Sequence, residues 1–148
     1  MEEIKKILIA TDGSEHTKPA VERGIQFAKL LNAKVTALYV VEPTPVTSVP
    51  SDSSVVFSVH AILEDEGKKA VEEVKVIGEK MGIEVTTLVV EGSPVKKILE
   101  AANEHDLIVI GTLGKTGLSK LFMGSVAERV TRYAPCPVLV VRGRRDQK

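Results

Sequence analysis

The sequence lacks the features of extracellular, membrane-spanning and nucleic-acid-binding proteins. Cys136 is its one cysteine, so no disulfide can form within the chain and nothing indicates an oxidising compartment. No apolar run approaches the roughly 20 residues of a membrane span, and the N-terminal run is too short for a signal peptide. Twenty basic residues balance twenty acidic ones, which removes any general attraction to nucleic acid or anionic lipid. We therefore expect a cytoplasmic protein without nucleic-acid or membrane partners.

What the chain does have is the composition of one folded domain. Its 148 residues are 43% hydrophobic and 27% charged, which fits a single domain spanning residues 1–148. Residues 42–57 are rich in proline, serine and threonine and predict an irregular surface loop. This loop is either a functional lid or dimer contact, or a disordered insertion. The basic end of the chain, residues 143–148, predicts a flexible, solvated tail.

Short apolar runs alternate with helical patterns along the chain. The runs typical of buried strands are Ile4–Ala10, Lys34–Val41, Val85–Val90, Asp106–Gly111 and Pro137–Arg142. The helices predicted between them are Thr17–Leu31, a helix of about 20 residues that ends near Met81, a helix with Ser93 as its N-cap, and a last helix after Gly124. The spacing of Val126, Val130 and Tyr133 predicts that all three are buried.

This alternation predicts an α/β fold in which helices cover both faces of a parallel sheet. Right-handed crossovers then allow a single doubly wound, Rossmann-like domain with five strands. We expect the strand order 3-2-1-4-5, with the winding direction reversing between the first and fourth strands. Ligands of such sheets bind at this point, beyond the carboxyl ends of the strands.

The loops after the first and fourth predicted strands are "TDGSEHT" and "GTLGKTGLSKLFMGS". The second contains the GKT of a P-loop, but Val109 stands where a P-loop needs its first glycine. The first has only Gly13, so the dinucleotide fingerprint G-x-G-x-x-G is absent too. The remaining glycines can bring backbone amides close to an anion, and the helix after Gly124 adds free N–H groups. These loops therefore predict a phosphate site built from backbone.

The glycines follow the pattern G-x2-G-x9-G-[S/T], which is met by Gly111, Gly114, Gly124 and Ser125. In this pattern, and in "ILIATDGSEHT" near the start, the chain resembles the ATP-binding members of the universal stress protein family. The resemblance covers nearly the whole chain, residues 42–57 excepted. It implies an ATP-dependent stress or signalling switch, a binder rather than a dedicated catalyst.

The resemblance assigns parts of ATP to particular positions. Asp12 and Gly111 are expected near the ribose, and Val40 is expected to meet the adenine edge through its backbone. The later glycines, with Ser125 and Val126, are expected to surround the phosphates. The complete predicted site is Ala10, Thr11, Asp12, Val40, Gly111, Thr112, Gly114, Lys115, Gly124, Ser125 and Val126.

Three of these residues also have a simpler local explanation. Ser125 with Glu128 matches a capping box, so its hydroxyl either caps the last helix or contacts phosphate. Asp12 stands before Gly13 and suits an Asx turn as well as a ligand contact. Lys115 is either a solvated loop lysine or a counter-charge for phosphate.

A triphosphate held mainly by neutral amides needs a cation, so we expect Mg²⁺ or Mn²⁺ held through ATP, with no metal ligand from the protein. No catalytic residue is predicted, because the two loops offer neither a positioned base nor an arginine near the phosphates. Hydrolysis is expected to be very slow at most. A slow ATPase or nucleotide-processing enzyme, and a partner-binding module with a vestigial site, stay open as alternatives.

The last predicted strand, Pro137–Arg142, begins with the apolar, uncharged run "PVLVV". In the expected strand order it is an exposed edge, which proteins usually cover or pair. Members of the family pair this strand with its twin, so the resemblance implies a homodimer through Pro137–Arg142. A further protein partner is compatible with the sequence, which does not name one.

Overall fold

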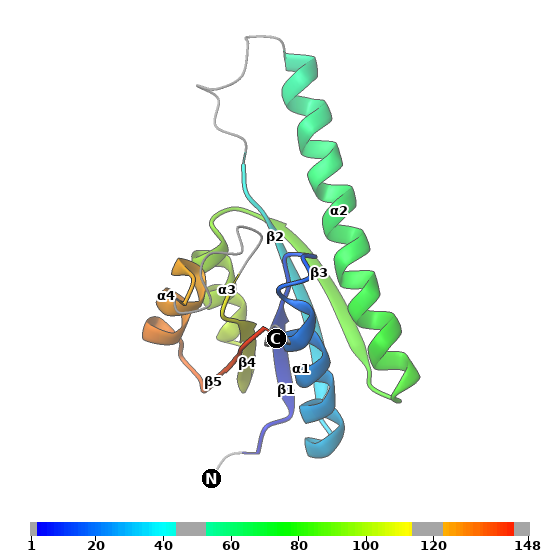
Figure 1. Cartoon of the computed structure of the whole chain (residues 1–148), viewed down its shortest axis with the longest axis vertical. Coiled ribbons are helices and arrows are strands. Elements are labelled where there is room, and N and C mark those ends of the chain that lie inside the picture. The colour runs from blue at the N-terminus through cyan, green and yellow to red at the C-terminus, as the bar shows by residue number, and fades with distance from the viewer. Residues whose placement is uncertain (1–2, 44–52, 114–122, 144–148) are drawn as a thin grey trace, which may run out of the picture.

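A parallel sheet lies between two pairs of helices (Figure 1) in the computed structural model, which describes residues 3–43, 53–113 and 123–143. In chain order the elements are β1 (Lys6–Ala10), α1 (Lys18–Leu31), β2 (Lys34–Val41), α2 (Ser53–Lys80), β3 (Val85–Glu91), α3 (Pro94–Ala102), β4 (Leu107–Gly111), α4 (Ser125–Tyr133) and β5 (Val138–Val141). The predicted α/β class and the alternation of strands and helices are confirmed.

The sheet has the order β3-β2-β1-β4-β5, and every neighbouring pair is parallel. This confirms the predicted order and places the reversal of winding between β1 and β4. The two strands are in register from Ile7 with Leu107 to Ile9 with Val109. Their carboxyl ends therefore stop at the same edge of the sheet, and the loops that follow them diverge to opposite faces.

Side chains of β1 alternate between two separate cores. Ile7 and Ile9 pack in the core beneath α1 and α2, whereas Leu8 and Ala10 pack in the core beneath α3 and α4. Ile7, Leu8 and Ile9 are completely inaccessible to solvent. Burial of such a side chain contributes roughly 1.5–3 kcal/mol, so the central strand is a rigid support for the loops at its end.

The second helix is longer than predicted. We expected about 20 residues after an irregular loop at residues 42–57, but α2 has 28 residues and begins at Ser53. Residues 53–57 are therefore helical. The sequence has neither glycine nor proline between Pro50 and Gly67, so nothing interrupts the helix there. Residues 44–52 of the predicted loop lie outside the described ranges.

The predicted burial of Tyr133 is wrong, because 62% of this residue is exposed. Ala127 and Val130 form the buried stripe of α4, and it continues through the partly buried Ala134 just beyond the helix. Tyr133 is the last residue of α4 and lies to one side of that stripe.

Candidate functional site

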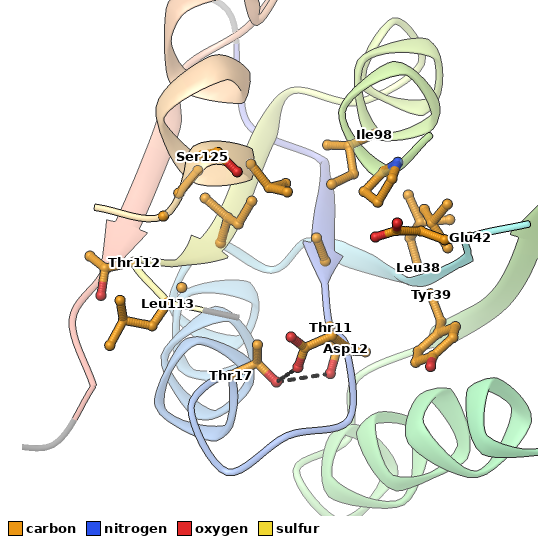
Figure 2. A pocket seen from close by; sticks show the side chains of 18 of the residues that line it. Thr11, Asp12, Thr17, Leu38, Tyr39, Glu42, Ile98, Thr112, Leu113 and Ser125 are labelled. Carbon is orange, nitrogen blue, oxygen red and sulfur yellow. Dashed lines mark hydrogen bonds between the residues drawn. The ribbon is translucent and has the colours of Figure 1, made fainter. Parts of the chain in front are cut away.

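A cavity of about 420 Å³ opens at the carboxyl ends of β1, β2 and β4 (Figure 2). The predicted site residues that line it are Ala10, Thr11, Asp12, Val40, Gly111, Thr112, Gly124, Ser125 and Val126. The other two predicted residues, Gly114 and Lys115, lie outside the described residues. The structure thus gathers the strand-end loops around one cavity, at the point where the winding of the sheet reverses.

Sequence reasoning missed part of the lining. Leu63 of α2, with Pro94 and Ile98 of α3, also lines the cavity. Glu42 was also missed, although it directly follows β2 and so stands at a carboxyl end, the signal that found the other loops. Thr17, the N-cap of α1, is a further lining residue that was not predicted.

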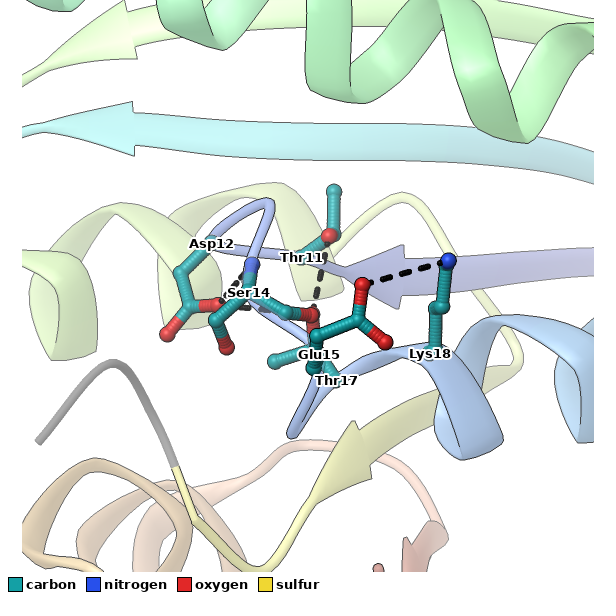
Figure 3. A network of polar contacts seen from close by, with 6 residues as sticks. All are labelled: Thr11, Asp12, Ser14, Glu15, Thr17 and Lys18. Carbon is teal, nitrogen blue, oxygen red and sulfur yellow. Dashed lines mark hydrogen bonds and ion pairs between the residues drawn. The ribbon is translucent and has the colours of Figure 1, made fainter. Parts of the chain in front are cut away.

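The loop after β1 is held by a compact hydrogen-bond network (Figure 3). Oδ1 of Asp12 accepts from the backbone N–H of Ser14 at 2.9 Å, which is the Asx turn that its sequence suggested. The same oxygen accepts from the hydroxyl of Thr17 at 3.3 Å. Gly13 adopts a left-handed φ of 77°, and a Cβ there would lie 3.2 Å from Cβ of Ala70 in α2. Glycine at this position therefore allows the turn to pack closely against α2.

Asp12 has a second oxygen that this network does not use. Among the described residues, no hydrogen bond to Oδ2 of Asp12 is found. The turn fixes the carboxylate through Oδ1, and the residue lines the cavity. Oδ2 is therefore available to accept a hydrogen bond from a ligand hydroxyl.

The start of α4 supplies hydrogen-bond donors to the opposite side of the cavity. Gly124 is the N-cap, and its N–H donates to the carbonyl of Thr112 at 2.6 Å. A Cβ on Gly124 would lie 3.1 Å from that carbonyl oxygen, so the close approach favours glycine. The N–H groups of Ser125, Val126 and the next residue occupy the first turn, where a helix provides no acceptors. They form the positive end of the helix dipole beside the cavity.

Of the two roles that the sequence left open for Ser125, the capping box is not found. Ser125 is the first residue of α4 rather than its N-cap, and no side-chain hydrogen bond caps this helix within the described residues. Gly124 holds the N-cap position because the tight contact with Thr112 leaves little room for a side chain. The hydroxyl of Ser125 is thus free of the capping role that competed with a ligand contact.

The backbone of β2 offers a further donor and acceptor. Two residues of β2 form hydrogen bonds toward β3. The N–H of Val35 donates to the carbonyl of Glu84, and the carbonyl of Val41 accepts from the N–H of Gly92. The carbonyl of Leu38 instead accepts from Thr11 on the β1 side. Because bonding direction alternates along a parallel strand, Val40 faces the β1 side as well. The pairing of β1 ends with Ala10 opposite Leu38, so the peptide groups of Val40 face the cavity.

Two other site types were tested in the described parts of the chain. These parts contain no group of three or more His, Cys, Asp or Glu side chains arranged to hold a metal ion. Across the same ranges, no helix is long and apolar enough to cross a membrane.

Fold and cavity together define a doubly wound α/β protein with a cavity at its strand ends. The Usp model of the universal stress protein family matches residues 3–142, and the chain belongs to this family. The family predicted from the glycine pattern and from the N-terminal stretch is therefore confirmed.

Individual relatives agree along nearly the full length. Universal stress protein MJ0531 of Methanocaldococcus jannaschii is 44% identical over 140 residues, which cover 93% of this chain and 82% of that protein. The structure of UspA from Lactobacillus plantarum has a TM-score of 0.86 at 25% identity and covers 96% of this chain and 100% of its own. A universal stress protein solved in complex with cAMP has a TM-score of 0.71 at 25% identity, covering 97% of this chain and 100% of its own.

Proposed function

We propose that this universal stress protein binds ATP, with Mg²⁺ or Mn²⁺ on the phosphates, in the cavity at the strand ends. The observation that carries the proposal is the placement of two sets of backbone groups on either side of β1. The start of α4 lies beyond β4, and the peptide of Val40 lies on β2. Between them stands Asp12. A related structure was solved with cAMP, which contains the same adenine, ribose and phosphate groups.

The phosphates belong at the start of α4. Its first-turn N–H groups and the hydroxyl of Ser125 are donors, and the helix dipole favours an anion there. Among the described lining residues there is no lysine, arginine or histidine. Neutral donors leave most of the charge of a triphosphate uncompensated, so a divalent cation bridging its oxygens completes the site.

The nucleoside belongs between β1, β2 and α3. Oδ2 of Asp12 accepts from a ribose hydroxyl, while Leu38 and Ile98 provide apolar surface for the base. The N–H and C=O of Val40 match the adjacent acceptor and donor on the edge of adenine. At about 420 Å³, the cavity falls in the range of roughly 300–1,000 Å³ usual for small-molecule sites.

In this proposal ATP marks a state of the protein and is hydrolysed little. The charged side chains among the described lining residues are the carboxylates of Asp12 and Glu42, and both belong to the nucleoside side. Phosphoryl transfer needs positive charge and a positioned water near the terminal phosphate. The ATP-bound protein acts as a cytoplasmic homodimer, in which β5 at the sheet edge pairs with β5 of the second copy.

The proposal is tested by the nucleotide content and affinity of the purified protein. Mass spectrometry of the supernatant after denaturation is expected to detect ATP or its diphosphate product. Calorimetry on the nucleotide-free protein is expected to show ATP binding with Mg²⁺ and weaker binding with EDTA. A protein that carries no nucleotide and gives no binding heat at millimolar ATP with Mg²⁺ would contradict the proposal.

A further inference from the structure

Glu42 brings a carboxylate to the side of the cavity opposite Ser125 and α4 (Figure 2). It follows the last residue of β2 and stands two positions beyond Val40. Figure 2 shows its carboxylate oxygens turned toward the open middle of the cavity. The apolar side chains of Leu38 and Ile98 lie on the same side of the cavity (Figure 2). Within the described residues, no cationic side chain pairs with Glu42, so a hydrogen-bond donor from the ligand would be its partner.

A carboxylate distinguishes between purines because it only accepts hydrogen bonds. The 6-amino group of adenine has two N–H bonds, and the carbonyl of Val40 can accept only one of them. The second needs another acceptor. A 6-oxopurine such as hypoxanthine or guanine presents a carbonyl oxygen at the same position, which a carboxylate repels.

We propose that Glu42 strengthens the base specificity of this cavity by accepting a hydrogen bond from the 6-amino group of adenine. This inference rests on the proposed function and names the base class that the site selects. Adenine nucleotides are favoured, while 6-oxopurine nucleotides and purines without an exocyclic group are disfavoured. The peptide group of Val40 already favours the adenine edge, and Glu42 adds to that discrimination by accepting the second N–H of the amino group.

The same carboxylate sets the direction in which a nucleotide enters. A triphosphate beside Glu42 would meet a like charge, and the two would repel each other. At the other side, the start of α4 attracts the phosphates. The cavity is thus electrostatically polarised between β2 and α4, and only one orientation of the nucleotide matches both ends.

The experiment compares ATP, ITP and purine riboside 5′-triphosphate. The three differ only in the substituent at position 6 of the ring and, for ITP, in a proton on the adjacent ring nitrogen. Calorimetry with Mg²⁺ gives the Kd of each ligand for the wild type, Glu42→Ala and Glu42→Gln. Because Glu42 is solvent-exposed, we expect the wild type to prefer ATP over either analogue by about 10-fold. Glu42→Ala should lose the part of this preference that the carboxylate contributes, while the peptide group of Val40 retains the rest. Glu42→Gln should shift it toward ITP, because an amide can donate to the 6-oxo group.

The matched control is Glu91→Gln, which removes a carboxylate at the end of the neighbouring strand and outside the cavity lining. It should keep the wild-type preference, and all variants should unfold at similar temperatures. An ATP-to-ITP ratio that is the same in the wild type and in Glu42→Ala, with ATP still bound, overturns the inference alone. Failure of the wild type to bind any of the three ligands overturns the proposed function and this inference with it.

Discussion

The hydroxyl of Thr17, at the start of α1, lies 3.3 Å from Oδ1 of Asp12, at the end of β1. It also lies 3.2 Å from the hydroxyl of Thr11 and 3.0 Å from the carbonyl of Ser14. One buried hydroxyl therefore joins both ends of the turn that carries Asp12. Since the other support of that carboxylate is the backbone N–H of Ser14, Thr17 is the side chain that positions Asp12.

Replacement of Thr17 by valine should test this support. Valine has nearly the same shape but no hydroxyl, so buried polar groups lose a partner and stability should fall by about 1–3 kcal/mol. ATP should also bind several-fold more weakly, because Asp12 is no longer held toward the ligand. Denaturant unfolding and calorimetry measure the two effects. The control is Thr131→Val, which removes a helical hydroxyl from the outer part of α4. Unchanged ATP affinity in Thr17→Val would argue against a positioning role.

Gly124→Val should abolish ATP binding in a folded protein. The new Cβ would stand 3.1 Å from the carbonyl oxygen of Thr112, and the branched side chain would occupy the entrance to the first turn of α4. The backbone at Gly124 has a negative φ of −61°, which valine can adopt, so folding should persist. Calorimetry and circular dichroism check both statements. Gly143→Val is the control, because nothing lies within 4 Å of its added Cβ.

Hydrolysis should be far below the ~1–100 s⁻¹ typical of kinases. The reason is that the described lining residues near α4 include no base and no cation to stabilise the transferred phosphoryl group. A steady-state phosphate-release assay measures the rate. Several turnovers per second, lost in an Asp12→Ala variant that still binds ATP, would instead make the protein an enzyme with Asp12 as a catalytic group.

Val140→Lys should convert a dimer into monomers in analytical ultracentrifugation. Val140 lies in β5, an edge strand whose four residues are half-buried in the single chain. A lysine in a paired β5 would bring two like charges together across the two-fold axis. The control is Leu88→Lys on β3 at the opposite edge, where Leu88 is 39% exposed. A wild type that sediments as a monomer at tens of micromolar would rule out the dimer.

Cys136 should react slowly with thiol reagents in the folded protein. Burial, together with the negative charge of Asp106, raises the pKa of its thiol above the ordinary value. Since the thiolate is the reactive form, less of it exists at a given pH than in the unfolded chain. Iodoacetamide labelling followed by mass spectrometry should show slower modification in buffer than in urea, with the pH profile displaced upward. Equal rates in the two conditions would contradict this.

The strand order could be predicted because it follows from local patterns and general rules. Apolar runs such as Lys34–Val41 mark the strands, and the handedness of crossovers allows few topologies. The loops after β1 and β4 followed from the same rule, whereas the individual residues, such as Asp12 and Gly124, came from the resemblance to the family. Leu63 and Ile98 could not be found this way, because their place in the cavity depends on how α2 and α3 pack across the sheet.

The errors at helix ends have a similar cause. The helix α2 begins at Ser53, in a stretch whose composition resembles a loop. Its backbone is nevertheless helical there, because it continues a helix whose later residues pack against the sheet. Tyr133 follows Val130 at helical spacing, but the buried stripe of α4 continues from Val130 to Ala134 and leaves Tyr133 exposed. Ser125 matches a capping motif, but the N-cap of α4 is the preceding residue, Gly124, which is in close contact with Thr112.

The alternating bonding direction along β2 makes two kinds of mutation unequal in their effect on the base recognition that we propose. Val40 presents its peptide group, so exchange for another β-branched residue leaves the same donor and acceptor in place. Insertion of a single residue between Lys34 and Val40 would turn that peptide toward β3 and away from the cavity. In the proposed site, the number of residues that precede Val40 in β2 therefore matters more for binding of the base than the identity of those residues.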